Sequence, residues 1–228
     1  MSTSPGKVET ALFAVGFAMA GLVFLAMLWS GAAAYDDMAR ASGVDRVALI
    51  AQVPGGGTYT TDRAGLVAMH ERWSRYITGG SMDAPRFEPT LFTEDEYSHM
   101  ADVRSVFDGA KLLIPAGLFV MAIRLQRARA KSLAAMFKLV RDGAIAAGIA
   151  VAVVGAVAAV AFDAAFLLFH QVFFPQGNFL FDPATSNLLR LYPDWYWQGI
   201  TFRIGLSFIG LAAAVAVAAA VGLRRALH

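Results

Sequence analysis

The stretch FHQVFFPQGNFLFDP, residues 169–183, begins where a long apolar run ends, and it contains a single histidine, His170. The run before it, residues 143–169, is rich in Ala, Gly and Val. A hydrocarbon core of about 30 Å is crossed by roughly 20 apolar helical residues, so this run is long enough to span a membrane. We therefore predict that His170 lies at the rim of a transmembrane helix.

Three more apolar runs predict three further spans, at residues 10–34, 106–123 and 200–223. Of the 228 residues, 57% are hydrophobic and 16% are charged, which excludes an ordinary soluble domain. The predicted fold class is an all-α membrane protein, a bundle of four transmembrane helices with a small mixed extracytoplasmic cap. We assign the bundle to residues 1–34 and 104–228, the cap to residues 35–103, and an outer interfacial loop to residues 170–199.

The placement of charge predicts the orientation in the membrane. Residues 124–141 carry six basic side chains and no acidic one, whereas residues 32–103 carry eleven acids and six arginines. Because Lys and Arg resist translocation, the short basic loop between two spans marks the cytoplasmic side. Both termini are then cytoplasmic and the rim at His170 is extracytoplasmic. In this position the basic loop indicates topology and contact with anionic lipid, not a nucleic-acid site.

The segment before the second span, LFTEDEYSHMADV at residues 91–103, carries the other candidate residues. Thr93 and Glu96 have the spacing of a capping box, which predicts a helix start. Three-residue spacing then places Glu96, His99 and Asp102 on one helical face. We expect this helix to continue into the second span and to kink at Pro115.

Counting along the helices places the two histidines at a similar height. His99 lies about 38 Å of helix from Arg124, and His170 about 44 Å from Arg141. Two imidazoles together can accept a proton from a nucleophile and return one to a leaving group. Asp163, on the same helical face as His170, is expected to orient it, which favours His170 as the base.

The region between the first two spans is expected to contain mixed structure. Residues 44–53 fit either a short strand or a buried helix end. Residues 62–77 predict an amphipathic helix, because Leu66, Met69 and Trp73 recur at helical spacing. His70 lies off this apolar stripe, so we expect it at the surface.

Other chemistries remain open at this point. The chain has no cysteine, which excludes disulfides and thiolate sites, and it has no GxSxG, Walker or dinucleotide motif. A metal-dependent membrane hydrolase would use Glu96, His99, Asp102 and His170 as ligands, although no tight ligand spacing such as HExxH is present. A proton- or cation-handling protein would use Asp163, and a non-catalytic membrane partner would use residues 35–103. We predict neither a metal nor a cofactor.

The two histidine segments resemble the Lit family of bacterial lipoprotein intramolecular transacylases. The resemblance rests on ExxHMxDV at residues 96–103, FHxxFFxxxNF at residues 169–179, FDP at 181–183 and LLRLYP at 188–193, and it covers most of residues 92–200. Phe179, Ser186 and Arg104 stand where the family pattern has Trp, Asp and Lys.

This resemblance implies an acyltransferase of the bacterial plasma membrane. Its reaction would move the sn-2 acyl chain of a diacylglyceryl lipoprotein to the α-amine of the N-terminal cysteine of that lipoprotein. The partners are then a diacylated lipoprotein and membrane lipid, with no nucleic acid and no implied oligomeric state. The site residues fall into three groups: catalytic His99 and His170, supporting Glu96, Asp102, Asp163 and Asn178, and lipid- or substrate-contacting Phe173 and Phe174.

Overall fold

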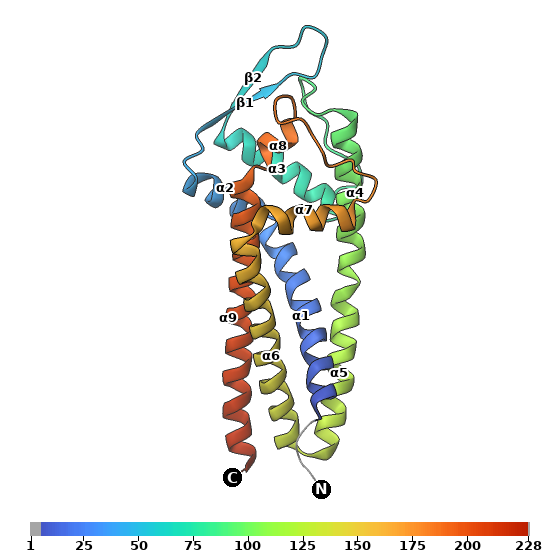
Figure 1. The fold of residues 1–228 in the computed structure, drawn as a ribbon, viewed down its shortest axis with the longest axis vertical. Helices are drawn as coiled ribbons and strands as arrows, with labels where there is room; N and C mark the ends of the chain where they lie inside the picture. The colour runs from blue at the N-terminus through green and yellow to red at the C-terminus, as the bar shows by residue number, and fades with distance from the viewer. Residues whose placement is uncertain (1–5, 228) are drawn as a thin grey trace. The chain divides into compact units, whose positions relative to one another are not determined.

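The computed structural model describes residues 6–227, which form helices and one small sheet (Figure 1). They divide into two units. The first comprises the residues up to Ala26, Ala110–Val160 and the residues from Phe202 onward. The second comprises Met27–Gly109 and Ala161–Thr201. Both sequence segments that carry the candidate histidines therefore belong to the second unit.

Four apolar helical stretches in the described chain are long enough to cross a membrane. They are α1 (Lys7–Trp29), the succession of α4 (Glu94–Lys111) and α5 (Leu113–Lys131), α6 (Leu133–Val160), and α9 (Asp194–Leu227). This finding confirms the predicted membrane class, and the four stretches overlap the four predicted spans.

Small residues allow close approach of helices within the first unit. A Cβ added to Gly117 of α5 would lie 2.4 Å from the carbonyl oxygen of Gly16 on α1. On α6, a Cβ at Gly143 would lie 2.4 Å from the ring of Phe13. Interfaces of this kind are typical of membrane helices, where small side chains let backbones pack closely. At the N-terminal end of α1, Glu9 pairs with Arg124 at 3.2 Å.

Two of the predicted span boundaries are wrong. The first span ends at Trp29, before residue 34, because a separate helix α2 (Ala32–Ala41) begins there. The third ends at Val160, before residue 169, because Ala161 leaves the helical region with φ −127° and ψ 49°. A new helix, α7 (Phe162–Phe173), follows. No Pro or Gly marks this break, but Asp163 in the first turn of α7 is favoured at a helix N-terminus.

The helix that was expected to kink at Pro115 is interrupted at Leu112, the residue between α4 and α5. Leu112 keeps helical angles, φ −65° and ψ −22°. Pro115 lies in the first turn of α5, where it has no N–H to donate to the carbonyl oxygen of Lys111. The missing hydrogen bond explains why the helix is interrupted at this position.

The second unit combines short helices with a two-stranded antiparallel sheet. Strand β1 (Arg46–Ile50) pairs with β2 (Thr58–Asp62), with Arg46 opposite Asp62. Within residues 44–53 the chain therefore forms a strand, Arg46–Ile50, and not a helix end. The remaining helices are α3 (Arg63–Ile77), which confirms the predicted amphipathic helix, and α8 (Asn187–Leu191).

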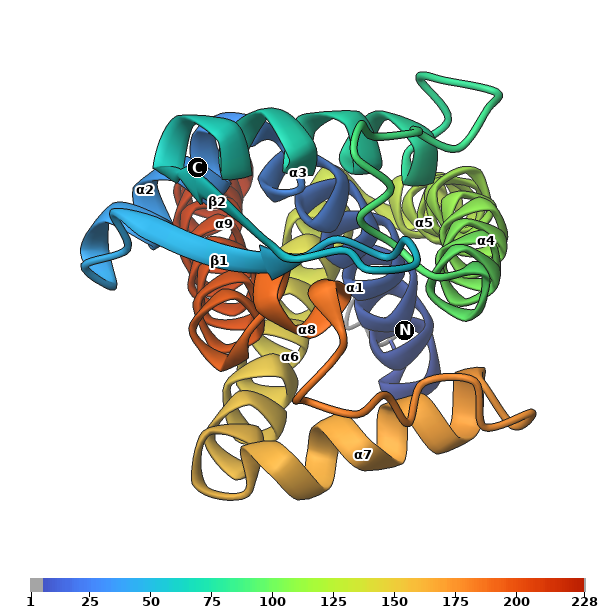
Figure 2. The same cartoon turned by 90° about the horizontal axis from the view of Figure 1, so that it is seen from above.

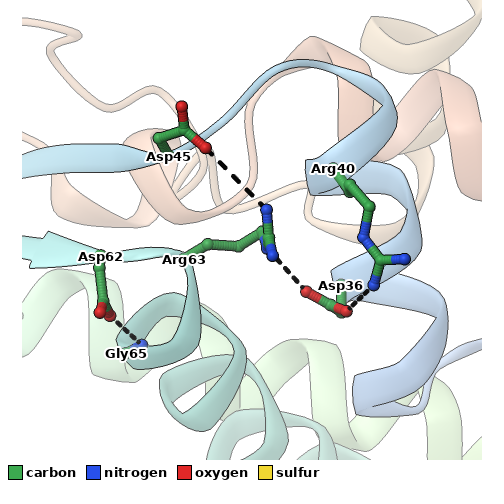
Figure 3. A network of polar contacts seen from close by, with 6 residues as sticks. All are labelled: Asp36, Arg40, Asp45, Asp62, Arg63 and Gly65. Atoms are coloured by element: carbon green, nitrogen blue, oxygen red, sulfur yellow. Dashed lines mark hydrogen bonds and ion pairs between the residues drawn. The ribbon is translucent and has the colours of Figure 1, made fainter.

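Ionic contacts fix the start of α3 beside α2 (Figure 3). Asp36 of α2 accepts a hydrogen bond from Arg63 at 3.0 Å, and Arg63 also lies 4.0 Å from Asp45. The Asp62 side chain caps α3 by accepting from the Gly65 N–H at 2.9 Å. These contacts join three segments of the second unit that sequence spacing alone does not relate.

His70 of α3 is buried, so the prediction of a surface position is wrong. Its Nε2 lies 3.1 Å from the carbonyl oxygen of Ser30, its Nδ1 lies 3.3 Å from the hydroxyl of Tyr192, and its ring stacks on Tyr35 with 4.4 Å between centroids. Because a carbonyl only accepts, Nε2 carries the hydrogen and Nδ1 accepts from Tyr192. Burial lowers the pKa of His70 to about 4, so it is neutral at physiological pH. His70 is thus a structural residue, covered by segments outside α3.

The close packing of α1 and α5 predicts a stability difference between two glycine variants. Replacing Gly117 by Val should lower the free energy of unfolding by about 1–3 kcal/mol, since the added side chain must displace the backbone of α1. Gly210→Val is the matched control, because a Cβ at Gly210 meets no atom within 4 Å. Thermal unfolding in detergent would compare them, and an equal Tm for both variants would contradict the close approach.

Candidate active site

The first histidine lies on α4, one turn after a capped N-terminus. The Thr93 N–H donates to Glu96 Oε2 at 2.9 Å, and the Glu96 N–H donates to Thr93 Oγ1 at 3.2 Å. This reciprocal pair confirms the capping box. Helical spacing then carries His99 to the same side of α4 as Glu96, and both side chains are buried.

The other carboxylate oxygen of Glu96 is used to hold α8. Its Oε1 accepts from the Ser186 hydroxyl at 2.6 Å and from the Leu188 N–H at 2.7 Å. With Thr93, three donors converge on a side chain that is only 1% exposed. Glu96 therefore supports the site by tying the start of α4 to the start of α8, and not by orienting an imidazole.

Asp102 holds the segment that follows α7. Its Oδ2 accepts from Gln176 at 2.8 Å and from the Asn178 amide at 2.5 Å. Two carboxylates of α4, placed before and after His99, thus fasten residues 176–188 around that histidine.

This arrangement brings the two histidines together. The rings of His99 and His170 are 6.1 Å apart between centroids and nearly parallel, with 18° between their planes. His170 Nδ1 lies 2.8 Å from the carbonyl oxygen of Phe166, one turn earlier in α7. Because that carbonyl only accepts, Nδ1 carries the hydrogen, and Nε2 of the neutral ring has a free lone pair.

Burial affects the ring nitrogens of both imidazoles. Burial lowers the pKa of His170 below its ordinary value, against the opposing effect of the hydrogen bond to Phe166, so the ring is neutral near pH 7. Nδ1 of His99 is buried and has no hydrogen-bond partner within residues 6–227. An unsatisfied buried nitrogen is unusual in a folded protein and calls for a functional explanation.

Aromatic rings form the walls around the two imidazoles. Phe174 is 2% exposed and lies 4.8 Å from His99 and 5.4 Å from His170, measured between ring centroids. Phe181 lies 5.6 Å from His99, and Phe179 lies 5.1 Å from His170. The aromatic walls lower the local dielectric, which strengthens electrostatic interactions inside the site.

Two sequence predictions change in the structure, and a third remains a prediction. Asp163 is exposed and forms no hydrogen bond or ion pair with His170, so the Phe166 carbonyl orients this imidazole instead. His170 also lies on a separate short helix and not at the end of the third span, because that span ends at Val160. Phe173 and Phe174 differ in environment: Phe173 is 48% exposed, whereas Phe174 is a buried wall.

The alternative of a metal site lacks a suitable ligand group. Among residues 6–227, no three His, Asp or Glu side chains are placed to hold one metal ion together. Glu96 and Asp102, the two carboxylates of that hypothesis, are hydrogen-bonded to other segments.

Three supporting residues were not identified from the sequence. Gln176 and Ser186 bond Asp102 and Glu96. Asn187 is fully buried and pairs with the backbone of Ile50, accepting from its N–H at 2.9 Å and donating to its oxygen at 2.7 Å. Their proximity to the FDP and LLRLYP segments was the available signal, but only the fold shows which groups they meet.

Comparison with known families identifies the class of protein. The family model described as "Lipoprotein intramolecular transacylase Lit" matches residues 10–197. The chain belongs to the Lit family. It is therefore a membrane enzyme of the lipoprotein intramolecular transacylase class, as the resemblance of the two histidine motifs indicated.

Two solved structures of Lit from Bacillus cereus have a similar fold. One, of a point variant, has a TM-score of 0.70 and 13% sequence identity over 96% of this chain and 92% of the other. The second has a TM-score of 0.66 and 15% identity over 96% of each chain. No curated protein matches the sequence. At these identities the likeness shows that the Lit fold is shared.

The hydrogen bonds of Glu96 predict that its amide variant is destabilised. Glu96→Gln replaces one accepting oxygen by an NH₂ that would face a donor, so we expect a loss of about 1.5–3 kcal/mol. Hydrogen exchange should then be faster at the Thr93 and Leu188 amides. Glu94→Gln is the control, since the Glu94 side chain is 86% exposed. Equal exchange in both variants would contradict the supporting role of Glu96.

Proposed function

We propose that the chain moves the sn-2 acyl chain of a diacylglyceryl lipoprotein to the α-amine of the N-terminal cysteine of the same molecule, leaving a lyso-form lipoprotein. The observation that carries this proposal is the pair of buried imidazoles, 6.1 Å apart, each with a ring nitrogen available for proton transfer. Family membership supports the reaction class, and the aromatic walls suit a substrate with lipid tails.

The amine arrives mostly as an ammonium ion, because an α-amino group has a pKa of about 8. In the proposed sequence, Nδ1 of His99 takes the first proton and produces the nucleophilic amine. The amine nitrogen then attacks the ester carbonyl carbon, a C–N bond forms, and Nε2 of His170 removes the second proton from that nitrogen. The carbonyl oxygen carries the negative charge of the tetrahedral intermediate.

Collapse of this intermediate breaks the bond between the carbonyl carbon and the sn-2 oxygen. Protonated His99 gives its proton to the departing glyceryl oxygen, and His170 releases its proton to water. The products are an amide, a free glyceryl hydroxyl and one proton, which balances the conversion of an ammonium and an ester. Since nucleophile and ester belong to one molecule, holding them together supplies much of the rate.

The charge distribution supports an extracytoplasmic site. The basic residues 124–141 would remain in the cytoplasm, which places both termini there and the histidines on the outer leaflet of a bacterial plasma membrane. The diacylated lipoprotein and membrane lipid are the partners in this proposal.

Removal of either imidazole should abolish most of the activity. We expect His99→Ala and His170→Ala to reduce lyso-form production by at least about 100-fold, the usual contribution of a general acid or base. Mass spectrometry of a synthetic diacylated lipopeptide, incubated with purified protein, would measure the shift of the acyl chain. Gln171→Ala is the control, because this exposed neighbour lies outside the site. Unchanged production by a folded His170→Ala protein would overturn the proposal.

The lowered pKa of His170 predicts the pH range in which its imidazole gains a proton. With the folded pKa below the ordinary value of about 6.5, the ring should stay neutral as the pH falls to 6.5 and gain its proton only at lower pH. NMR of protein labelled at histidine, with His170→Gln for assignment, would follow the imidazole carbon shift. A midpoint above 6.5 would contradict the lowering of the His170 pKa by burial.

A further inference from the structure

The face of α7 opposite His170 is apolar and uncovered. At 100° per residue, Leu168 and Val172 lie on the far side of the helix from His170. Leu168 is 61% exposed and Val172 is 62% exposed, whereas His170 is 7% exposed. Phe169, beside them, is 45% exposed. A helix face exposed to water would carry polar residues at these positions.

The whole segment around α7 lacks charge. Residues 164–181 contain no Asp, Glu, Lys or Arg, although most of these positions are exposed. Leu180, in the loop after α7, is 75% exposed. The exposed face of α3 in the same unit is different, since it carries Glu71, Arg72 and Arg75. The exposed faces of the two helices therefore differ in polarity.

The length and direction of α7 fit a helix lying in the plane of the membrane. With residues Phe162–Phe173 it extends about 18 Å, too short to span a bilayer. Figures 1 and 2 show that α7 runs across the direction of α4, which is seen nearly end-on in Figure 2 while α7 is seen along its length. A helix that crosses the direction of α4 and is too short to span a bilayer suits a position along the membrane surface.

The chain that leads into α7 is also apolar. The apolar span α6 ends at Val160, which is 91% exposed, and Ala161 alone separates it from α7. The chain thus enters α7 directly from a membrane-crossing helix. Short apolar helices in such positions are typical of interfacial segments.

We propose that α7 is an in-plane helix whose outer face is covered by the acyl chains of the bilayer. His170, on its inner face, is then held at the depth of lipid ester groups. The rings of Phe169 and Phe173 pair at 4.6 Å between centroids and lie at the side of α7, between the outer face and His170. Resting on the proposed function, this placement means that the transferred acyl chain reaches His170 along these rings without leaving the bilayer.

Spin labelling tests the proposal directly, because a chain without cysteine accepts single labels at chosen sites. Leu168→Cys and Val172→Cys would each carry a nitroxide in nanodiscs of phosphatidylethanolamine and phosphatidylglycerol. Glu71→Cys on α3 is the control for water, and Val217→Cys, 65% exposed on the membrane-crossing α9, is the control for lipid. Power saturation compares relaxation by oxygen, which concentrates in lipid, with relaxation by a water-soluble nickel chelate.

Labels at 168 and 172 should follow the label at 217, with oxygen relaxing them several-fold more strongly than the nickel chelate. Stronger relaxation by the nickel chelate, as expected at 71, would overturn the proposal. Low accessibility to both reagents, with dipolar broadening between labels, would also overturn it by showing that a second copy covers α7. The spin-label measurement does not depend on enzymatic turnover. A result against the in-plane helix can therefore be distinguished from a result against the proposed function, which the histidine variants test.

Discussion

Two carboxylates on one helix hold this site together. Glu96 and Asp102 lie three residues before and after His99, so α4 presents all three side chains to the segment that returns after α7. Glu96 fastens the far end of that segment through Ser186 and Leu188, and Asp102 fastens its near end through Gln176 and Asn178. The loop between these points brings Phe179 and Phe181 against the imidazoles. The hydrogen bonds of the two carboxylates therefore help to keep His170 beside His99.

In the proposed reaction these carboxylates have a supporting role. Both accept hydrogen bonds from neutral donors of other segments, and the two imidazoles in the aromatic site are the groups proposed to transfer protons. A charged partner beside His170 would raise its pKa, whereas the Phe166 carbonyl fixes the tautomer at little electrostatic cost. This division between supporting acids and reacting bases suits an enzyme whose substrate must first lose a proton.

Local rules predicted much of the fold and of the site. The capping box at Thr93 and Glu96 gave the start of α4, and apolar runs gave the four spans, because both signals depend only on neighbours in sequence. The pairing of His99 with His170 followed from the family resemblance and from their expected heights. Long-range contacts could not be predicted from such local signals. The hydrogen bonds of Asn187 with Ile50 join residues far apart in the chain, and no periodicity in the sequence predicts them.

The errors have physical causes of the same kind. The helix breaks at Ala161 without a Pro or Gly, and the sequence stays apolar on both sides. The sequence therefore gives no signal that one helix ends and another begins there. That break moves His170 from a span to α7 and separates it from the support expected of Asp163. His70 was placed at the surface by the stripe of its own helix, but Tyr35 and Tyr192 from other elements cover it.

The central claim is that His99 and His170 act as one proton-transfer unit on one ester. The most direct measurement is kcat/KM for His99→Ala, His170→Ala and the double variant with a synthetic diacylated lipopeptide. Residues that work as a unit are strongly non-additive, so the double variant should lose no more activity than the more damaged single variant. If the two losses multiply instead, the histidines act independently and the account is contradicted.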